Sequence, residues 1–334
     1  MADFYVATTG SGTGVGTEGD PFTLAQAVAK ADYSNYDNIW IKAGTYTLTS
    51  TLTVADTNIF FRGYNTTIND LDEVWGEGTG ATAKPVITKT GAVNDLVSWN
   101  DNVVCNLVFT GADRDNTING TWYNCVSKNA GDDGYITGRA TLCIADSNTD
   151  VGFGCDTSFS LAKDNGGAGY GLGSHSFSVA YSNTGQGFLN FATGWCAGCT
   201  SYDNGGDGFE GFELYTDCIS AENGGWGYDS YGMTINCNAY NNTSGTSDAD
   251  LININLDTSD PALTSPATDD FSPGANMYKK GAYIKAEKKK SSRGLLLSLI
   301  SLTGEVLLKM PVAMGDTGSG DSKVNTTANL KNLF

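Results

Sequence analysis

The sequence is poor in positive charge, in histidine and in long apolar runs. Its 334 residues contain 19 Lys and Arg against 37 Asp and Glu, for a formal net charge of −18, and a single histidine. A chain this acidic repels phosphate backbones and anionic lipid, so we expect no nucleic-acid partner. The longest apolar run, 295–302, has eight residues and includes two serines, so we expect no membrane insertion.

The first residues, Met-Ala-Asp-Phe-Tyr-Val, contain neither the basic nor the apolar part of a secretory signal. This predicts synthesis in the cytosol, where cysteine thiols stay reduced. Proline is scarce, with six residues, whereas glycine is abundant, with 43. Glycine together with many Asn, Asp, Ser and Thr favours short strands joined by tight turns.

An internal repeat dominates the middle of the chain. Seven segments that begin at residues 125, 143, 160, 178, 199, 218 and 237 align with steps of 17 to 21 residues. Repeats of this length are typical of solenoids, in which each unit buries its apolar side against its neighbours. We therefore predict one all-β solenoid of about a dozen short coils.

Four positions of the repeat each keep one residue type. Coils that stack in parallel about 4.8 Å apart place equivalent side chains above one another, so inward aromatic rings form a rib and inward Asn amides a ladder. Glycine beside the ring leaves room for the backbone to bend. The Asn column is Asn148, Asn165, Asn183, Asn204, Asn223 and Asn242; the Gly column is Gly134, Gly152, Gly169, Gly187, Gly208 and Gly227; the aromatic column is Tyr135, Phe153, Tyr170, Phe188, Phe209 and Tyr228.

The remaining column consists of cysteine or serine and predicts buried, reduced thiols. Ser160 and Ser178 replace cysteine in two coils, which argues against disulfides between neighbours. Cys196 and Cys199 form a lone CxxC pair without a second pair or a nearby histidine, so we expect no metal site there. The five cysteines of the column are Cys125, Cys143, Cys199, Cys218 and Cys237.

The segments Asn204-Gly-Gly-Asp-Gly-Phe209 and Asn223-Gly-Gly-Trp-Gly-Tyr228 resemble the repeat of right-handed parallel β-helix proteins of the pectin-lyase-like superfamily. The resemblance extends over residues 1–285 and includes the opening segment 42–46. It implies a single-stranded right-handed parallel β-helix. Left-handed β-helices fit less well because their six-residue subperiod is absent, and the calcium-binding nonapeptide repeat matches only at 224–231.

The pattern divides the chain into an N-terminal cap at 1–37, the β-helix at 38–290 and a C-terminal segment at 291–334. In the cap, Thr23 and Gln26 form a capping box for a short helix with Leu24, Ala27, Val28 and Ala31 on one face. We expect this helix to cover the first coil. Strands are predicted at 38–41, 46–54, 59–61 and 252–256, with turns at Gly44 and Gly63 and closing elements at 269–273 and 281–284.

The C-terminal segment reads as an apolar hairpin at 295–312, preceded by a basic run at 279–293. A lone apolar hairpin is marginal in water, so we expect it to attach to other copies of the chain or to a capsid or tail protein. The alternative is that it plugs the last coil. The expected attachment residues are Leu295, Leu297, Leu299, Leu308 and Phe334.

One cluster of aspartates is the candidate site. The alignment places Asp132 and Asp150 in one column, and Asp113 and Asp133 in the next, with Arg114 and Asp115 beside them. Carboxylates about 5 Å apart suit a calcium ion or an acid–nucleophile pair. The segment 131–134 also resembles the paired aspartates of polygalacturonases, although the Gly-His-Gly motif of that family is missing.

We expect the aspartates to stabilise turns rather than to catalyse a reaction. The weak catalytic candidates are Asp132, Asp133, Asp150 and the single histidine, His175. The candidate ligand-binding residues are Asp113, Arg114, Asp115 and Asp133; the candidate calcium ligands are Asp113, Asp132, Asp133 and Asp150; no other cofactor is expected. Trp195, Trp226 and Tyr231 are of a type that stacks on sugar rings, but we assign them to the core.

These features favour a non-enzymatic virion structural protein on the particle surface, such as a capsid decoration, spike or fibre, because phage surface proteins use the fold that the resemblance implies. The first alternative is a carbohydrate-active β-helix, either a polysaccharide lyase or hydrolase or a depolymerising tailspike that acts on cell-surface polysaccharide. The second is a bacterial surface adhesin, which would be extracellular.

Overall fold

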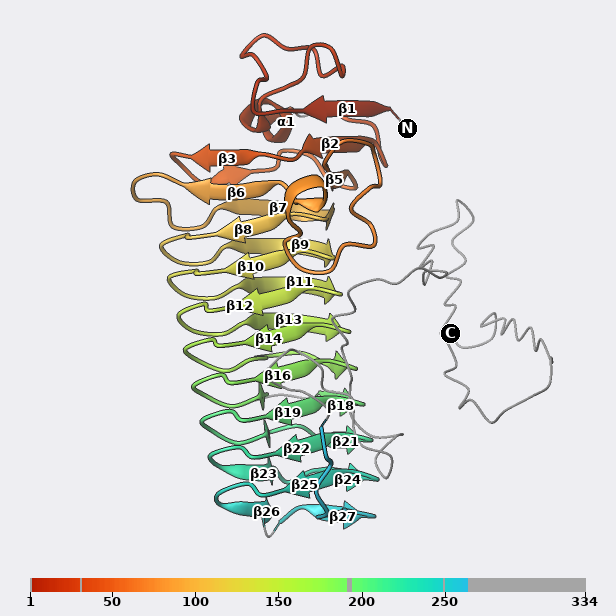
Figure 1. Cartoon of the computed structure of the whole chain (residues 1–334), viewed down its shortest axis with the longest axis vertical. Coiled ribbons are helices and arrows are strands. Elements are labelled where there is room, and N and C mark those ends of the chain that lie inside the picture. Colours follow the sequence, from red (N-terminus) through yellow and green to blue (C-terminus); the bar gives the residue numbers. More distant parts are fainter. Residues whose placement is uncertain (1, 31, 191–193, 249, 264–334) are drawn as a thin grey trace, which may run out of the picture. The chain divides into compact units, whose positions relative to one another are not determined.

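A computed structural model describes residues 2–30, 32–190, 194–248 and 250–263. These residues form a right-handed parallel β-helix of about 11 turns, whose coils follow one another in chain order (Figure 1). The fold class predicted from the repeat is therefore confirmed. The chain divides into two compact units, 1–286 and 287–334, and the second lies outside the described residues.

The largest sheet has 13 strands, and its neighbouring strands pair in parallel. In spatial order they are β1 (Asp3–Val6), β2 (Asn38–Lys42), β5 (Phe60–Tyr64), β7 (Val97–Cys105), β9 (Thr117–Tyr123), β11 (Tyr135–Thr141), β13 (Phe153–Ser158), β15 (His175–Ser176), β18 (Trp195–Ala197), β21 (Leu214–Thr216), β24 (Met233–Ile235) and β27 (Ile252–Ile254), with β4 (Leu52–Thr53) beside β7.

A second sheet has ten strands and a third has four. The ten are β3 (Thr45–Leu48), β6 (Val86–Lys89), β8 (Val108–Thr110), β10 (Val126–Lys128), β12 (Ile144–Asp146), β14 (Leu161–Lys163), β16 (Val179–Tyr181), β19 (Thr200–Tyr202), β22 (Ile219–Ala221) and β25 (Asn238–Tyr240). The four are β17 (Phe188–Leu189), β20 (Phe209–Glu210), β23 (Trp226–Asp229) and β26 (Gly245–Ser247).

The aromatic column forms a continuous stack in the interior. From Tyr135 to Tyr228, neighbouring ring centroids are 4.5 to 5.1 Å apart and the ring planes lie within 9° of parallel. All six rings are fully buried. Offset stacking of this kind adds to the free energy gained by burying each ring, which confirms the predicted rib.

The Asn column forms an equally continuous ladder. From Asn148 to Asn223, each Nδ2 donates to the Oδ1 of the Asn one coil later, at 2.8 to 2.9 Å. The same Oδ1 accepts the backbone N–H of the earlier Asn. A buried turn thereby keeps its polar groups satisfied, as the repeat predicted.

Most coils turn at two residues with positive φ, which we call corner residues. One set lies directly before the Cys or Ser column and its equivalents, and the other directly before the Asn column. The first set is Asn106, Asn124, Leu142, Phe159, Phe177, Gly198, Asp217, Asn236 and Asn255; the second is Asn129, Ser147, Asp164, Ser182, Asp203, Glu222 and Asn241. Asn adopts this left-handed conformation readily, whereas in Leu and Phe it has a higher conformational energy because of steric contacts.

Glycine serves close approach between coils rather than the bend that we predicted. The Gly column has no positive φ, but a Cβ at Gly152 would lie 2.6 Å from the carbonyl oxygen of Gly169 and 2.8 Å from Asn165 Nδ2. Gly63 is also not a turn residue, because it lies inside β5, where a Cβ would meet the carbonyl oxygen of Asn106 at 2.1 Å.

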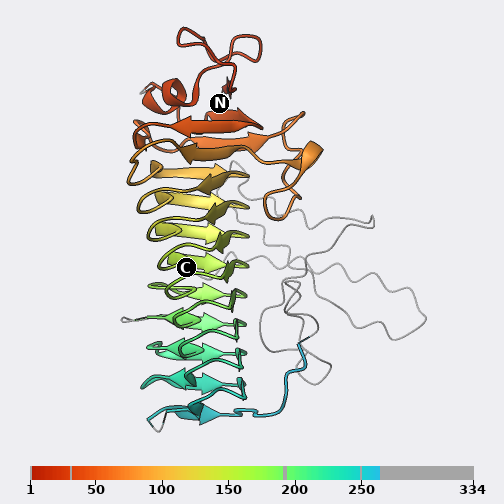
Figure 2. The same cartoon turned by 60° about the vertical axis from the view of Figure 1, so that its left-hand side comes forward.

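The N-terminal end of the β-helix is covered as predicted. Helix α1 (Leu24–Ala29) begins with the Thr23–Gln26 capping box and buries Leu24, Ala27 and Val28 in the main core. The helix and β1 lie at one end of the coil stack (Figure 2). The predicted strand at 46–54 is instead two strands, β3 and β4, because the chain passes there from the ten-stranded to the 13-stranded sheet. A short 3₁₀ helix, Gly80–Thr82, follows later.

Two inward positions of the last described coil carry polar residues, Ser247 and Asn253. Ser247 lies opposite Tyr228, so the aromatic stack ends here. Thr234 Oγ1 donates to Asn253 Oδ1 at 2.7 Å, and Asn253 Nδ2 donates to Ser247 Oγ at 3.1 Å. The predicted closing elements at 269–273 and 281–284, the hairpin at 295–312 and the attachment residues lie outside the described residues, as does Ala31. Within the described part, no helix has the length and apolar character needed to span a membrane.

All eight cysteines are free and buried, which confirms the prediction for the cysteine column. Burial raises the pKa of the Cys196 thiol to about 11 and that of Cys105 to about 12, so neither is a reactive thiolate at neutral pH. We therefore expect a thiol reagent to react with none of the eight in the native protein and with all eight after unfolding. Disulfides among the column cysteines would contradict this prediction.

Candidate functional site

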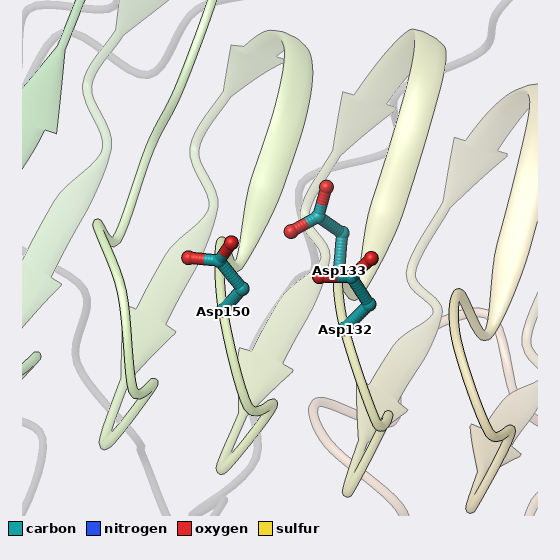
Figure 3. A group of neighbouring side chains, drawn as sticks. All are labelled: Asp132, Asp133 and Asp150. Carbon is teal, nitrogen blue, oxygen red and sulfur yellow. The ribbon is translucent and has the colours of Figure 1, made fainter.

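Three aspartates from two successive coils come together. Asp132 and Asp133 lie in the turn before β11, and Asp150 lies in the equivalent turn before β13 (Figure 3). One carboxylate oxygen from each residue lies within 4.8 Å of the others. The backbone N–H of Asp150 donates to the carbonyl oxygen of Asp132 at 3.1 Å, so these two residues share a column, as the alignment predicted.

Asp133 has the most perturbed carboxyl group of the three. Its pKa is raised to about 6, mainly by burial and also by the neighbouring Asp132, Asp115 and Asp150, against the lowering effect of a hydrogen bond from Val151 N–H to Oδ1 at 2.8 Å. A carboxylate held in this way favours neutralisation by a proton or a cation. Three carboxylate oxygens are the ligands that a hard cation such as Ca²⁺ prefers.

The neighbouring Asp115 links the backbones of two successive coils. Its Oδ1 accepts the N–H of Asp133 at 3.2 Å, one coil further on. Burial raises the pKa of Asp115, and the Arg114 guanidinium lies 3.5 Å from its carboxylate and 3.9 Å from that of Asp95. Asp115 and Asp133 therefore each accept a backbone N–H from the turn of the neighbouring coil.

Asp113 does not join the cluster, and its predicted column was wrong. The N–H of Gly131 donates to the carbonyl oxygen of Ala112, and the N–H of Asp132 to that of Arg114, so Asp113 lies opposite Gly131 and not opposite Asp133. Its carboxylate pairs with Lys89 and accepts the N–H of Val93 at 2.9 Å. The acidic cluster is therefore Asp132, Asp133 and Asp150.

His175 lies in the core. It is fully buried in β15, and its ring packs against Tyr170, Phe188 and Phe212. Nδ1 is 2.9 Å from Thr157 Oγ1 and Nε2 is 3.2 Å from the carbonyl oxygen of Gly171. Burial lowers its pKa to about 4. Both ring nitrogens are occupied and no solvent reaches them, so His175 is a core residue and not an acid–base catalyst.

An exposed apolar surface on the 13-stranded sheet was missed by the sequence analysis. Trp195, Leu214, Met233 and Ile252 occupy equivalent outward positions of four successive strands. Trp195 is 46% exposed and Ile252 58%. In the N-terminal coils, the equivalent positions of the same sheet include Thr121, Arg139 and Asp156. Polar residues at these positions separate this apolar column from Val103 and Phe60, which occupy equivalent positions of two earlier strands.

A shallow cavity of about 470 Å³ adjoins this column and is lined by Tyr231, Met233, Ile252, Glu213 and Phe212 among others. Tyr231 is 87% exposed. The assignment of Trp195 and Tyr231 to the core was therefore wrong, and Trp226 is half-buried. The signal was present in the sequence, since none of the three belongs to the aromatic column.

We expect calcium at about 1 mM to raise the melting temperature of the protein, because three carboxylates that repel one another bind a cation only in the folded chain. Asp133→Asn keeps an oxygen for Val151 N–H but removes a ligand, so it should abolish the calcium shift. Asp113→Asn is the matched control and should leave the shift intact. An equal calcium shift in wild type and Asp133→Asn would contradict a cation site at this cluster.

No protein-family model matches the chain, and no curated protein matches it by sequence. Solved structures do. The A-module of mannuronan C-5 epimerase AlgE6 from Azotobacter vinelandii is similar with a TM-score of 0.50 and 12% identity, over 71% of this chain and 94% of that one. This likeness shows the parallel β-helix fold.

Two further structures are similar at lower scores. Pectate lyase Pel9A has a TM-score of 0.48 and 19% identity, over 88% of this chain and 94% of that one. The ORF18 protein of Geobacillus virus E2 has a TM-score of 0.42 and 9% identity, over 66% of this chain and 52% of that one.

Proposed function

We propose that this protein is a non-enzymatic structural component of a virus particle, a spike, fibre or capsid decoration whose rigid shaft is the β-helix. The observation that carries the proposal is the unbroken pair of ladders inside the shaft. Six aromatic rings and six Asn side chains continue through successive coils without interruption. Stacked ladders of this kind resist local opening, which suits a surface protein exposed to proteases.

Two of the residues that the sequence offered for acid–base chemistry, His175 and Asp133, support this proposal, because each has a structural task. His175 fills the core, and Asp115 and Asp133 each accept a backbone N–H of the next coil. A cation at the acidic cluster would tie two coils together rather than activate a substrate. In this proposal the protein is made in the host cytoplasm and lies on the virion surface.

Attachment is proposed to reside in the C-terminal segment 291–334, through its apolar residues and the basic run that precedes it. Deletion after Lys290 should leave the melting temperature of the β-helix nearly unchanged, while the protein becomes monomeric or no longer co-sediments with its particle. The control is the full chain in the same sedimentation experiment. If the deleted chain unfolds or associates end to end, the segment is a cap and the attachment role is wrong.

A carbohydrate-active protein is the second candidate, favoured by the exposed Trp195 and Tyr231 beside the cavity. Exposed aromatic side chains supply flat surfaces for sugar rings. The fold is shared with an enzyme named for mannuronan. Incubation with acidic polysaccharides, followed by measurement of chain length, separates the candidates. Cleavage that disappears in Asp133→Asn would overturn the structural role, whereas binding that is lost only in Trp195→Ala with Tyr231→Ala would place a glycan at the apolar column.

A further inference from the structure

One lysine of the β-helix is buried. Lys84 is 2% exposed and is the only Lys or Arg among the buried residues in the described part of the chain. It stands two residues before β6, as Asn106 stands before β8 and Asn124 before β10. Because the first residues of these three strands pair with one another, Lys84, Asn106 and Asn124 occupy equivalent positions of three successive coils.

The loop between β5 and β6, residues 65–85, ends at this lysine and is bonded to the next coils. Asn106 Nδ2 donates to Asp72 Oδ1 at 2.8 Å, and Asn124 Nδ2 donates to the carbonyl oxygen of Leu71 at 3.2 Å. In both views this orange loop lies beside the coils that follow it (Figures 1 and 2). Trp75 of the loop packs against an apolar cluster on the outer face of the ten-stranded sheet, which consists of Val108, Val126, Ile144, Leu161 and Val179. The loop therefore covers part of that face.

The amine of Lys84 contacts two oxygen atoms of a single residue. Nζ donates to the backbone carbonyl oxygen of Asn124 and, at 3.0 Å, to its Oδ1. Within the described residues, Lys84 forms no ion pair with a carboxylate. A buried ammonium without a carboxylate is unfavourable, and burial lowers the pKa of Lys84 to about 8. A fraction of the amine is therefore neutral at pH 7, and a neutral amine is a nucleophile.

The carboxamide of Asn124 is held in one orientation. Its Nδ2 donates to the carbonyl oxygen of Leu71 and, at 2.7 Å, to Asn106 Oδ1, which leaves Oδ1 directed toward Lys84. A carbonyl bond is about 1.2 Å long, so Asn124 Cγ lies within about 4.2 Å of Lys84 Nζ. Reacting atoms in a productive geometry are about 3 to 3.5 Å apart. A small side-chain rotation therefore brings the amine onto the amide carbon.

We propose that Lys84 and Asn124 form an intramolecular isopeptide bond. Nζ of neutral Lys84 attacks Cγ of Asn124 and forms a new C–N bond. The bond between Cγ and Nδ2 breaks, one proton passes from Nζ to Nδ2, and ammonia leaves. The reaction needs no oxidant, reductant or other reagent. It removes a buried charge and ties the loop 65–85 and the coil of β6 covalently to the coil of β10, across the coil of β8.

The mass of the full chain tests the proposal. Under denaturing conditions the protein should be lighter than its sequence predicts by one ammonia. Trypsin cleaves after the basic residues that bound segments 63–89 and 115–128, but not between Lys84 and Pro85. The digest should therefore contain a branched species in which these two peptides are joined, at the sum of their masses less one ammonia.

Lys84→Arg and Asn124→Ala should each give the mass expected from the substituted sequence and release the two peptides only separately. Lys89→Arg is the matched control, because it keeps the trypsin site, and should retain the branched species. Asn119→Ser removes the Asn-Gly pair from the second peptide, a pair that can also lose ammonia by closing a succinimide ring, and should retain the branched species as well. The wild-type digest decides the question even where a variant fails to fold.

Absence of the branched species from the wild-type digest would overturn the proposal, provided that the protein was first incubated for a prolonged time at about pH 8, where about half of the Lys84 amine is neutral. It is also overturned if the mass deficit maps to Asn119, if the branched species persists in Asn124→Ala, or if Lys84 is joined to a residue other than Asn124.

Discussion

Replacing Phe188 by alanine is expected to lower the free energy of unfolding by about 3 to 5 kcal/mol. Phe188 is fully buried in the middle of the aromatic stack, with ring centroids 4.5 Å from Tyr170 and 4.8 Å from Phe209. Its removal leaves a cavity between two rings that are held in place by their own coils. The stack cannot close over the cavity, because the coil spacing is fixed by the backbone hydrogen bonds between parallel strands.

Urea unfolding followed by circular dichroism measures this loss. Tyr231→Ala is the control, since an exposed aromatic ring should change stability by no more than about 0.5 kcal/mol. Phe188→Leu should fall between the two, because it restores part of the apolar volume. A loss below about 1 kcal/mol for Phe188→Ala would show that the ring does not carry the stability of the central coils.

As the pH falls from 6.5 to 4, protonation of His175 alone is expected to lower the free energy of unfolding by about 3 kcal/mol. Burial lowers the pKa of the folded ring to about 4, whereas the unfolded ring titrates near 6.5. Between these values the unfolded chain binds the proton and the folded chain does not. The contribution of His175 to the free energy of unfolding is therefore fully present above pH 6.5 and is lost as the pH falls toward 4.

Urea unfolding of wild type and of His175→Gln at pH 7, 5.5 and 4.5 gives the free energy of unfolding of each protein. The difference between the two proteins at each pH isolates the contribution of His175. The comparison is necessary because Asp133, with its pKa raised to about 6, acts in the opposite direction: its protonation favours the folded chain as the pH falls below 6. Since the chain has one histidine, its ring protons can be followed by NMR without ambiguity. A folded-state titration near pH 6.5 would show that His175 is accessible to solvent.

The interior of the central coils followed from the sequence because each column has a marker residue. The aromatic, Asn and Cys columns repeat through the coils from residue 125 onward, and all three are in the positions that the alignment gave them. One coil earlier, the register predicted from the sequence was wrong. The marker residues are replaced there by Leu107, Ala112 and Thr117, so nothing in the sequence fixed the position of Asp113.

The candidate site could be predicted only in part. Asp132 and Asp150 are one repeat apart, and that spacing alone brought them together. His175 carries no such signal, because its column contains Thr157 before it and Cys196 after it, residues with no common chemistry. The packing of Tyr170, Phe188 and Phe212 around the ring, and not the identity of its column, determines that it is buried and neutral.

The sequence by itself determined the fold class, the capping helix and the composition of the interior, since in a solenoid every contact inside the stack repeats at the period of the chain. Only the tertiary structure determined which outer faces of the sheets are covered and which are exposed. Trp75 packs against the apolar cluster that contains Ile144, and Lys84 donates a hydrogen bond to Asn124, across long stretches of chain that share no repeat. Contacts between segments far apart in the sequence leave no periodic signal, so the covered face of the ten-stranded sheet and the exposed apolar column of the 13-stranded sheet appear only once the coils are stacked.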